Sequence, residues 1–127
     1  MNHLSDIRTV GVPVTDQDRA VAFYTDTLGF ELLMDAPLEQ FGGRWIVVAP
    51  AGAAASIALV PASDGNPAGV DTGIRLASPD AKAAHEHFLS AGVDTDELLE
   101  WPGVPAMFSL RDQDGNRLYV SQNVSDS

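Results

Sequence analysis

The chain carries few side chains of the kinds that perform chemistry, and its histidines are spaced unfavourably for a metal or catalytic site. There is no cysteine, and the three histidines are His3, near the start, and His85 and His87, in one predicted helix. Residues two apart on a helix point about 200° apart, so His85 and His87 cannot bind one ion together. Neither a glycine-rich phosphate loop nor a dinucleotide-binding fingerprint is present.

Arg75 is the side chain best suited to binding an anion. It lies in the sequence GIRLA, where Ile74 and Leu76 are expected to pack under a helix and to turn Gly73, Arg75 and Ala77 toward the opposite face. An arginine in a cleft can bind a carboxylate, phosphate or enolate through two parallel hydrogen bonds. The alternative role for Arg75 is a structural ion pair with a partner across the cleft.

Two similar sets of elements are expected to position these side chains. Each begins with an alternating strand, IRTVGVPV or GIRLA, and continues into an amphipathic helix that ends at Gly29 or Gly92. The first helix is expected to be capped by Thr15 or Asp16, and the second by Ser78. Three apolar segments follow each helix: FELLMD, RWIVVAP and ASIALVP in the first set, and LLEWP, PAMFSL and RLYVSQ in the second.

This repeat predicts an α+β fold of two β-α-β-β-β modules, whose curved mixed sheets form a cleft with the helices outside. We expect residues 1–127 to be a single domain, with module one at about 7–61, a linker at 62–69 and module two at about 70–122. The sequence DQDGN predicts a hairpin before the last strand, because glycine and asparagine tolerate positive φ.

Composition restricts the possible partners. The formal net charge is −11, from 7 basic and 18 acidic residues, and such a surface repels a polyanion such as nucleic acid. No apolar run approaches the length of about 18 residues that a membrane span needs, and the first residues lack the layout of a secretory signal. The absence of cysteine fits a reducing compartment. We expect a cytoplasmic protein that binds neither nucleic acid nor membrane.

The layout, with VPVTDQDRAVAFYTDTLGF near the start and FSLRDQDGNRLYV near the end, resembles the vicinal oxygen chelate superfamily. This superfamily includes glyoxalase I, bleomycin-resistance proteins and extradiol dioxygenases, and the resemblance covers about residues 7–122. It implies that metal-dependent members place four ligands, usually His, Glu or Gln, at Thr9, Ala58, Thr72 or Gly73, and Tyr119. None of these residues is a strong ligand for Zn²⁺, Ni²⁺ or Fe²⁺, so we expect no metal and no other cofactor.

The remaining candidates suit the binding of a small organic molecule, since an apolar cavity with a few polar anchors is the usual form of such a site. Strand alternation and aromatic character select the expected ligand-binding residues, with Phe108 as a further possible wall. They are Thr9, Pro13, Trp45, Ala58, Arg75, Trp101, Met107 and Tyr119. The expected ligand has an apolar or aromatic body and an anionic or electron-rich oxygen that Arg75 binds.

Two functions are compatible with these residues. One is a protein that binds and sequesters a small molecule, as the bleomycin-resistance branch does. The other is an enzyme of the same superfamily, a lyase, isomerase or dioxygenase, either metal-free with Tyr119 or Arg75 stabilising a developing anion, or with displaced metal ligands. We also expect a homodimer, because one copy covers its sheet edges and apolar mouth poorly and two-fold pairing commonly buries such surface.

Overall fold

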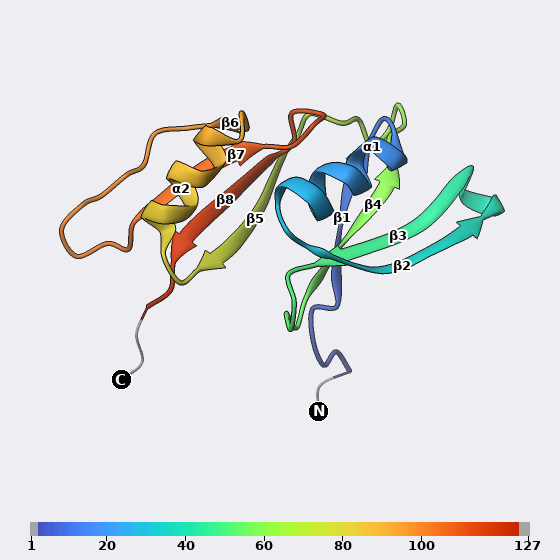
Figure 1. The fold of residues 1–127 in the computed structure, drawn as a ribbon. Coiled ribbons are helices and arrows are strands. Elements are labelled where there is room, and N and C mark those ends of the chain that lie inside the picture. Colours follow the sequence, from blue (N-terminus) through green and yellow to red (C-terminus); the bar gives the residue numbers. More distant parts are fainter. Residues whose placement is uncertain (1–2, 125–127) are drawn as a thin grey trace. The chain divides into compact units, whose positions relative to one another are not determined.

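A computed structural model of the chain describes residues 3–124 (Figure 1). The chain divides into two compact units at the boundary between Ala68 and Gly69, which is the end of the predicted linker. Each unit has a four-stranded mixed sheet and a helical segment that follows its first strand. The predicted α+β class and the β-α-β-β-β order within each module are therefore confirmed.

The first unit contains a sheet with the strand order β1-β4-β3-β2. Its elements are β1 (Thr9–Val14), α1 (Gln17–Ala22), the π-helix η1 (Phe23–Thr27), β2 (Glu31–Leu38), the 3₁₀ turn η2 (Glu39–Phe41), β3 (Gly43–Ala49) and β4 (Ser56–Pro61). β1 runs parallel to β4, and the other two pairs are antiparallel. The parallel pair is possible because the chain between β1 and β4 is long enough to cross over.

The core of the first unit lies between the sheet and its helical segment. Val12 and Val14 of β1 are almost completely buried, as alternation predicts, and Tyr24 of η1 is fully buried. The Asp16 carboxylate accepts a hydrogen bond from the backbone N–H of Arg19 and caps α1. Gly29, with φ of +80°, ends the helical segment as predicted.

The second unit contains a sheet with the strand order β5-β8-β7-β6. Its elements are β5 (Asp71–Ser78), α2 (Ala81–Ser90), β6 (Asp94–Thr95), β7 (Met107–Arg111) and β8 (Arg117–Gln122). α2 packs against β6, β7 and β8 and covers Leu110 and Leu118, which are fully buried. None of the described helices has the length and apolar character of a membrane span.

Two predicted details of the second unit are wrong. The cap of α2 is Asp80, whose carboxylate accepts a hydrogen bond from the Ala83 N–H, whereas the Ser78 hydroxyl accepts from the N–H of Asp80 before the helix begins. The segment LLEWP forms no regular strand, because the chain pairs with β7 earlier, at β6, and then makes one isolated bridge from Leu99 to Met107.

The DQDGN turn before β8 forms as predicted, but Asn116 does not adopt the positive φ that the prediction allowed for it. Gly115 has φ of +80°, and no described residue other than glycine has a positive φ. Asn116 instead is fully buried, and its side-chain oxygen accepts hydrogen bonds from the N–H groups of Gly69 and Val70 at 2.8 and 3.0 Å. The turn therefore holds the chain that leads into β5.

Candidate functional site

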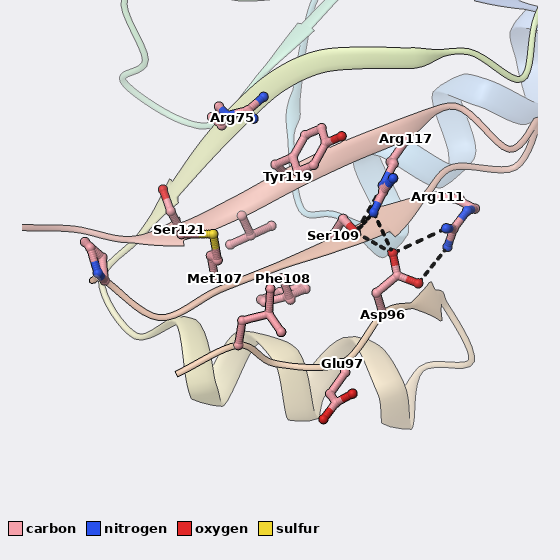
Figure 2. Close-up of a pocket in the computed structure, with 13 residues that line it drawn as sticks. Arg75, Asp96, Glu97, Met107, Phe108, Ser109, Arg111, Arg117, Tyr119 and Ser121 are labelled. Atoms are coloured by element: carbon pink, nitrogen blue, oxygen red, sulfur yellow. Dashed lines mark hydrogen bonds and ion pairs between the residues drawn. The ribbon is translucent and has the colours of Figure 1, made fainter. Parts of the chain in front are cut away.

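A pocket lies within the second unit, along β5, β7 and β8 and beside the segment 96–105 (Figure 2). Its volume is about 580 Å³, which suits a small organic molecule. The lining residues come from strand positions and from the segment that joins β6 to β7. They are Arg75, Asp96, Glu97, Leu99, Pro105, Met107, Phe108, Ser109, Arg111, Arg117, Tyr119, Val120 and Ser121.

Strand alternation brings the polar members of this set to one surface. In β7, Phe108 and Leu110 are buried, whereas Met107 and Arg111 are only partly buried, and Phe108 meets the ring of His85 edge to face with centroids 5.0 Å apart. Successive side chains of a strand point to opposite faces, so the strand shows Met107 and Arg111 to the pocket side. Phe108 therefore serves the core beneath α2 as well as the pocket wall.

Asp96 is the centre of a charged cluster at one end of the pocket. Its carboxylate accepts two hydrogen bonds from Arg111, at 3.1 and 3.3 Å, and one from Arg117 at 3.4 Å. Ser109 also donates its hydroxyl proton to Asp96. The Ser109 hydrogen bond and the Arg111 pair hold the pKa of Asp96 below its ordinary value. Asp96 is thus ionised at neutral pH and is the shared ion-pair partner of both arginines.

Tyr119 lies at the middle of the pocket, and its hydroxyl is already engaged. It donates a hydrogen bond to an oxygen of Asp71 at 2.6 Å, and the other oxygen of Asp71 accepts from the N–H of Gly73 at 3.1 Å. This hydrogen bond raises the pKa of Tyr119, and it is also the main cause of the lowered pKa of Asp71. Tyr119 is therefore neutral at physiological pH and presents chiefly its ring face to the pocket.

Arg75 covers the ring of Tyr119. Its guanidinium carbon lies 4.2 Å from the ring centroid, within the range of a cation–π interaction, and its Nη1 donates to the Gly73 carbonyl at 2.8 Å. Within residues 3–124 no carboxylate forms an ion pair with Arg75, in contrast to Arg111 and Arg117. The alternative role for Arg75, an ion pair with a partner across the cleft, stays a prediction.

The structure brings three of the eight predicted ligand-binding residues together in this pocket, namely Arg75, Met107 and Tyr119. Thr9 and Trp45 line a different, smaller pocket of about 220 Å³ in the first unit. The remaining three line neither pocket: Pro13 and Ala58 are buried in the first sheet, and Trp101 lies in a turn with 57% of its surface exposed. A ligand-binding role for the residues outside the larger pocket stays a prediction.

Six polar residues of the pocket were not among the predicted ligand-binding residues: Asp96, Glu97, Ser109, Arg111, Arg117 and Ser121. The alternation in MFSLR contains a signal for two of them, because Ser109 and Arg111 are spaced like Met107, which was predicted. Asp96 follows β6 in a segment without periodicity, and its position depends on the pairing of β6 with β7. No local pattern could have placed its carboxylate beside the two arginines.

The residues at the metal-ligand positions implied by the family do not fit a divalent ion. Ala58 offers a methyl group and Gly73 no side chain, whereas the hydroxyls of Thr9 and Thr72 each donate to a backbone carbonyl oxygen. The hydroxyl of Tyr119 is neutral and engaged, as described above. Across residues 3–124, no group of three histidine, aspartate or glutamate side chains is placed to hold an ion.

Comparison with known proteins identifies the family. The chain matches the Glyoxalase/Bleomycin resistance protein/Dioxygenase superfamily over residues 2–120. The chain therefore belongs to this superfamily, which the sequence features had suggested. A relative of Bacillus subtilis (strain 168), the uncharacterized protein YetH, is 30% identical over 117 residues, which are 89% of this chain and 94% of YetH.

Solved structures with the same fold include an antibiotic binding protein. TnmS3 from Streptomyces sp. CB03234 is 33% identical, with a TM-score of 0.86 over 98% of this chain and 100% of TnmS3. A superfamily member from Sphaerobacter thermophilus DSM 20745 is 29% identical, with a TM-score of 0.86 over 94% of this chain and 98% of that protein. The superfamily includes enzymes and binding proteins, so the fold alone does not decide between them.

Proposed function

We propose that this protein binds a small apolar or aromatic organic molecule in the pocket of its second unit, without a metal ion. The observation that carries the proposal is the pocket itself, whose volume of about 580 Å³ combines an apolar wall with a few polar groups. Leu99, Met107 and Phe108 supply apolar surface, and Tyr119 supplies an aromatic face. The similarity to TnmS3, an antibiotic binding protein, supports a binding role.

An enzyme of the superfamily is the alternative, and two carboxylates give it less support: Asp96, which lines the pocket, and Asp71, which binds the hydroxyl of Tyr119. A general base works best when its pKa lies near the operating pH. Hydrogen bonds and ion pairs instead lower the pKa values of Asp71 and Asp96, which makes both carboxylates weak proton acceptors. Tyr119 has its proton engaged by Asp71, so it is poorly placed to donate to a developing anion. Binding and sequestration therefore account better for these groups than catalysis does.

The neutral fluorescent probe N-phenyl-1-naphthylamine tests this binding role. We expect the wild-type protein to bind it at one site per chain, with an affinity that EDTA leaves unchanged. Met107→Glu should weaken binding at least about tenfold, because it places a carboxylate in the apolar wall, where burial of an unpaired charge is costly. Leu89→Glu is the matched control, since Leu89 is an exposed residue of α2 outside the pocket and the change in charge is the same.

Fluorescence titration gives the affinity and stoichiometry of each variant, and circular dichroism checks that both remain folded. Equal binding by the Met107→Glu and Leu89→Glu variants would place the probe elsewhere and contradict the assignment of the pocket. A loss of binding in EDTA that added Zn²⁺ or Ni²⁺ restores would contradict the metal-free site.

We further propose that the chain forms a homodimer in the cytoplasm. The edge strand β2 carries three consecutive exposed apolar residues, Leu32, Leu33 and Met34, with 45%, 56% and 50% of their surface exposed. Exposed edge strands with apolar surface are commonly covered by a second copy in a symmetric pair. The absence of cysteine supports a reducing compartment.

Light scattering coupled to size-exclusion chromatography should give twice the 13.4 kDa mass of one chain at micromolar concentration. Leu33→Lys should shift the protein toward the monomer, because it places a charge on the apolar edge. A monomeric mass for the wild-type protein across the accessible concentration range would rule the dimer out.

A further inference from the structure

We propose that Arg75 is the anion-binding residue of this pocket and that the natural ligands are aromatic anions, such as phenolates or carboxylates. The inference rests on the proposed binding function and names the chemical class of its ligand. It concerns the three guanidinium groups that line the pocket, those of Arg75, Arg111 and Arg117. Their different partners decide which of them can bind a negatively charged oxygen from outside.

Two of these arginines are already paired with carboxylates of the protein, and Arg111 also reaches Asp94 at 3.4 Å. Arg111 makes a two-point pair with Asp96, and Arg117 reaches the same carboxylate at 3.4 Å. Arg117 also donates to the Ser109 hydroxyl oxygen from Nε at 3.2 Å and from Nη2 at 3.1 Å. An incoming anion would have to displace Asp96 from a charge-assisted pair to reach them, which costs more than binding to an unpaired guanidinium.

Within residues 3–124, Arg75 forms no ion pair with a carboxylate, and the nearby Asp71 attracts it only at longer range. Its hydrogen bond to a protein acceptor is the one from Nη1 to the Gly73 carbonyl, and in the described part of the chain Nε and Nη2 meet no protein acceptor. The Nε and Nη2 groups of Arg75 therefore form one edge of the guanidinium that a ligand can bind. Figure 2 shows Arg75 on β5, apart from the cluster around Asp96. A planar guanidinium with a free edge binds a carboxylate or phenolate oxygen well.

The surroundings of Arg75 hold it in place before a ligand arrives. Gly73, with φ of +71°, forms a bulge in β5, so that its carbonyl accepts from Arg75 and its N–H donates to Asp71. Asp71 in turn accepts the hydroxyl proton of Tyr119, whose ring lies beneath the guanidinium. Because Tyr119 donates its proton to Asp71, Arg75 is the group of this array that can donate to an anion. Arg117 also lies over this ring, with its guanidinium carbon 5.2 Å from the centroid. The surface that favours an aromatic ligand body therefore comes chiefly from Leu99, Met107 and Phe108 of the pocket wall.

Arg75 also lies next to two of the positions at which the family resemblance implied metal ligands. They are the positions of Gly73 and Tyr119, and Arg75 contacts both of these residues. A positive charge fixed on the protein thus lies between residues that provide no metal ligand. This arrangement supplies an electrostatic partner for an anionic oxygen without a bound ion.

Two probes with the same aromatic body separate this inference from the proposed function. 8-Anilinonaphthalene-1-sulfonate carries a sulfonate anion, and N-phenyl-1-naphthylamine is its neutral counterpart. Arg75→Gln should weaken binding of the sulfonate at least about tenfold and change binding of the neutral probe less than about twofold, because it removes a charge-assisted interaction. Arg75→Met, which keeps the apolar stem over Tyr119, should give the same result. Arg19→Gln, at an exposed residue of α1, controls for the change in net charge.

Fluorescence titrations measure the affinity of both probes for four proteins: the wild type and the Arg75→Gln, Arg75→Met and Arg19→Gln variants. Retention of the neutral probe by the Arg75 variants also shows that the pocket is folded. Equal loss of both probes would make Arg75 a structural residue and overturn the inference. Unchanged affinity for the sulfonate would overturn it too, while leaving the proposed binding function intact. Failure of the wild-type protein to bind either probe would overturn the binding function itself, and the inference with it.

Discussion

Tyr24→Ala should lower the free energy of unfolding by about 3–5 kcal/mol, the usual cost of truncating a large buried aromatic residue. Tyr24 is fully buried in the first unit. Its ring meets those of Phe23 and Phe30 edge to face, with centroids 5.7 Å apart in both pairs. Two backbone hydrogen bonds hold the turn that carries these rings: the Leu28 N–H donates to the Phe23 carbonyl at 3.0 Å, and the Phe30 N–H donates to the Tyr24 carbonyl at 2.9 Å.

Urea denaturation followed by circular dichroism measures this change. Leu4→Ala is the control in the same unit, since Leu4 is 87% exposed and its truncation should cost less than about 1 kcal/mol. A loss of less than about 1.5 kcal/mol in the Tyr24→Ala variant would show that the aromatic cluster does not hold the first unit together.

Asn116→Ala should destabilise the protein by about 2–4 kcal/mol through the second unit. The variant removes the acceptor of the Gly69 and Val70 N–H groups and the amide that donates to Asp112 at 3.0 Å. Leaving a buried donor or acceptor without a partner costs about 1–3 kcal/mol for each group. Alanine cannot replace these hydrogen bonds, and its methyl group leaves a space in a fully buried position.

Asn123→Ala is the matched control for this variant, because Asn123 is an exposed residue after β8 and its truncation should change stability by less than about 0.5 kcal/mol. The same denaturation curves measure both variants. If the Asn116→Ala variant were as stable as the Asn123→Ala variant, the DQDGN turn would not be a structural support of the second unit.

The two destabilised variants together test our proposal that residues 1–127 are a single domain. A unit of about 60 residues buries only about 60% of the surface that its unfolded chain exposes and is marginally stable alone. We therefore expect one cooperative transition that shifts as a whole in either variant. Two transitions, each sensitive to one variant only, would show that the units unfold independently.

Features that depend on nearest neighbours were predictable from the sequence. Gly29 and Gly92 end the helical segments with φ of +80° and +81°, because only glycine adopts that conformation without strain. Alternation placed Val12 and Val14 in the core and Arg75 away from the α2 side. The repetition of these local patterns was sufficient to predict two modules, because each pattern depends on only a few adjacent residues. The family came from the resemblance of two motifs to a known superfamily.

Features that depend on distant pairing were decided by the tertiary structure alone. Asp96 meets Arg111 and Arg117 because β6 pairs with β7 and carries an aperiodic segment to the end of the pocket. Trp101, apolar in type, lies exposed in a turn because that segment forms no further strand. The tertiary structure also decides which pocket arginine lacks an ion-pair partner, because this depends on the positions of all nearby carboxylates. Strand alternation can orient a side chain, but it cannot identify the neighbours of that side chain across the sheet.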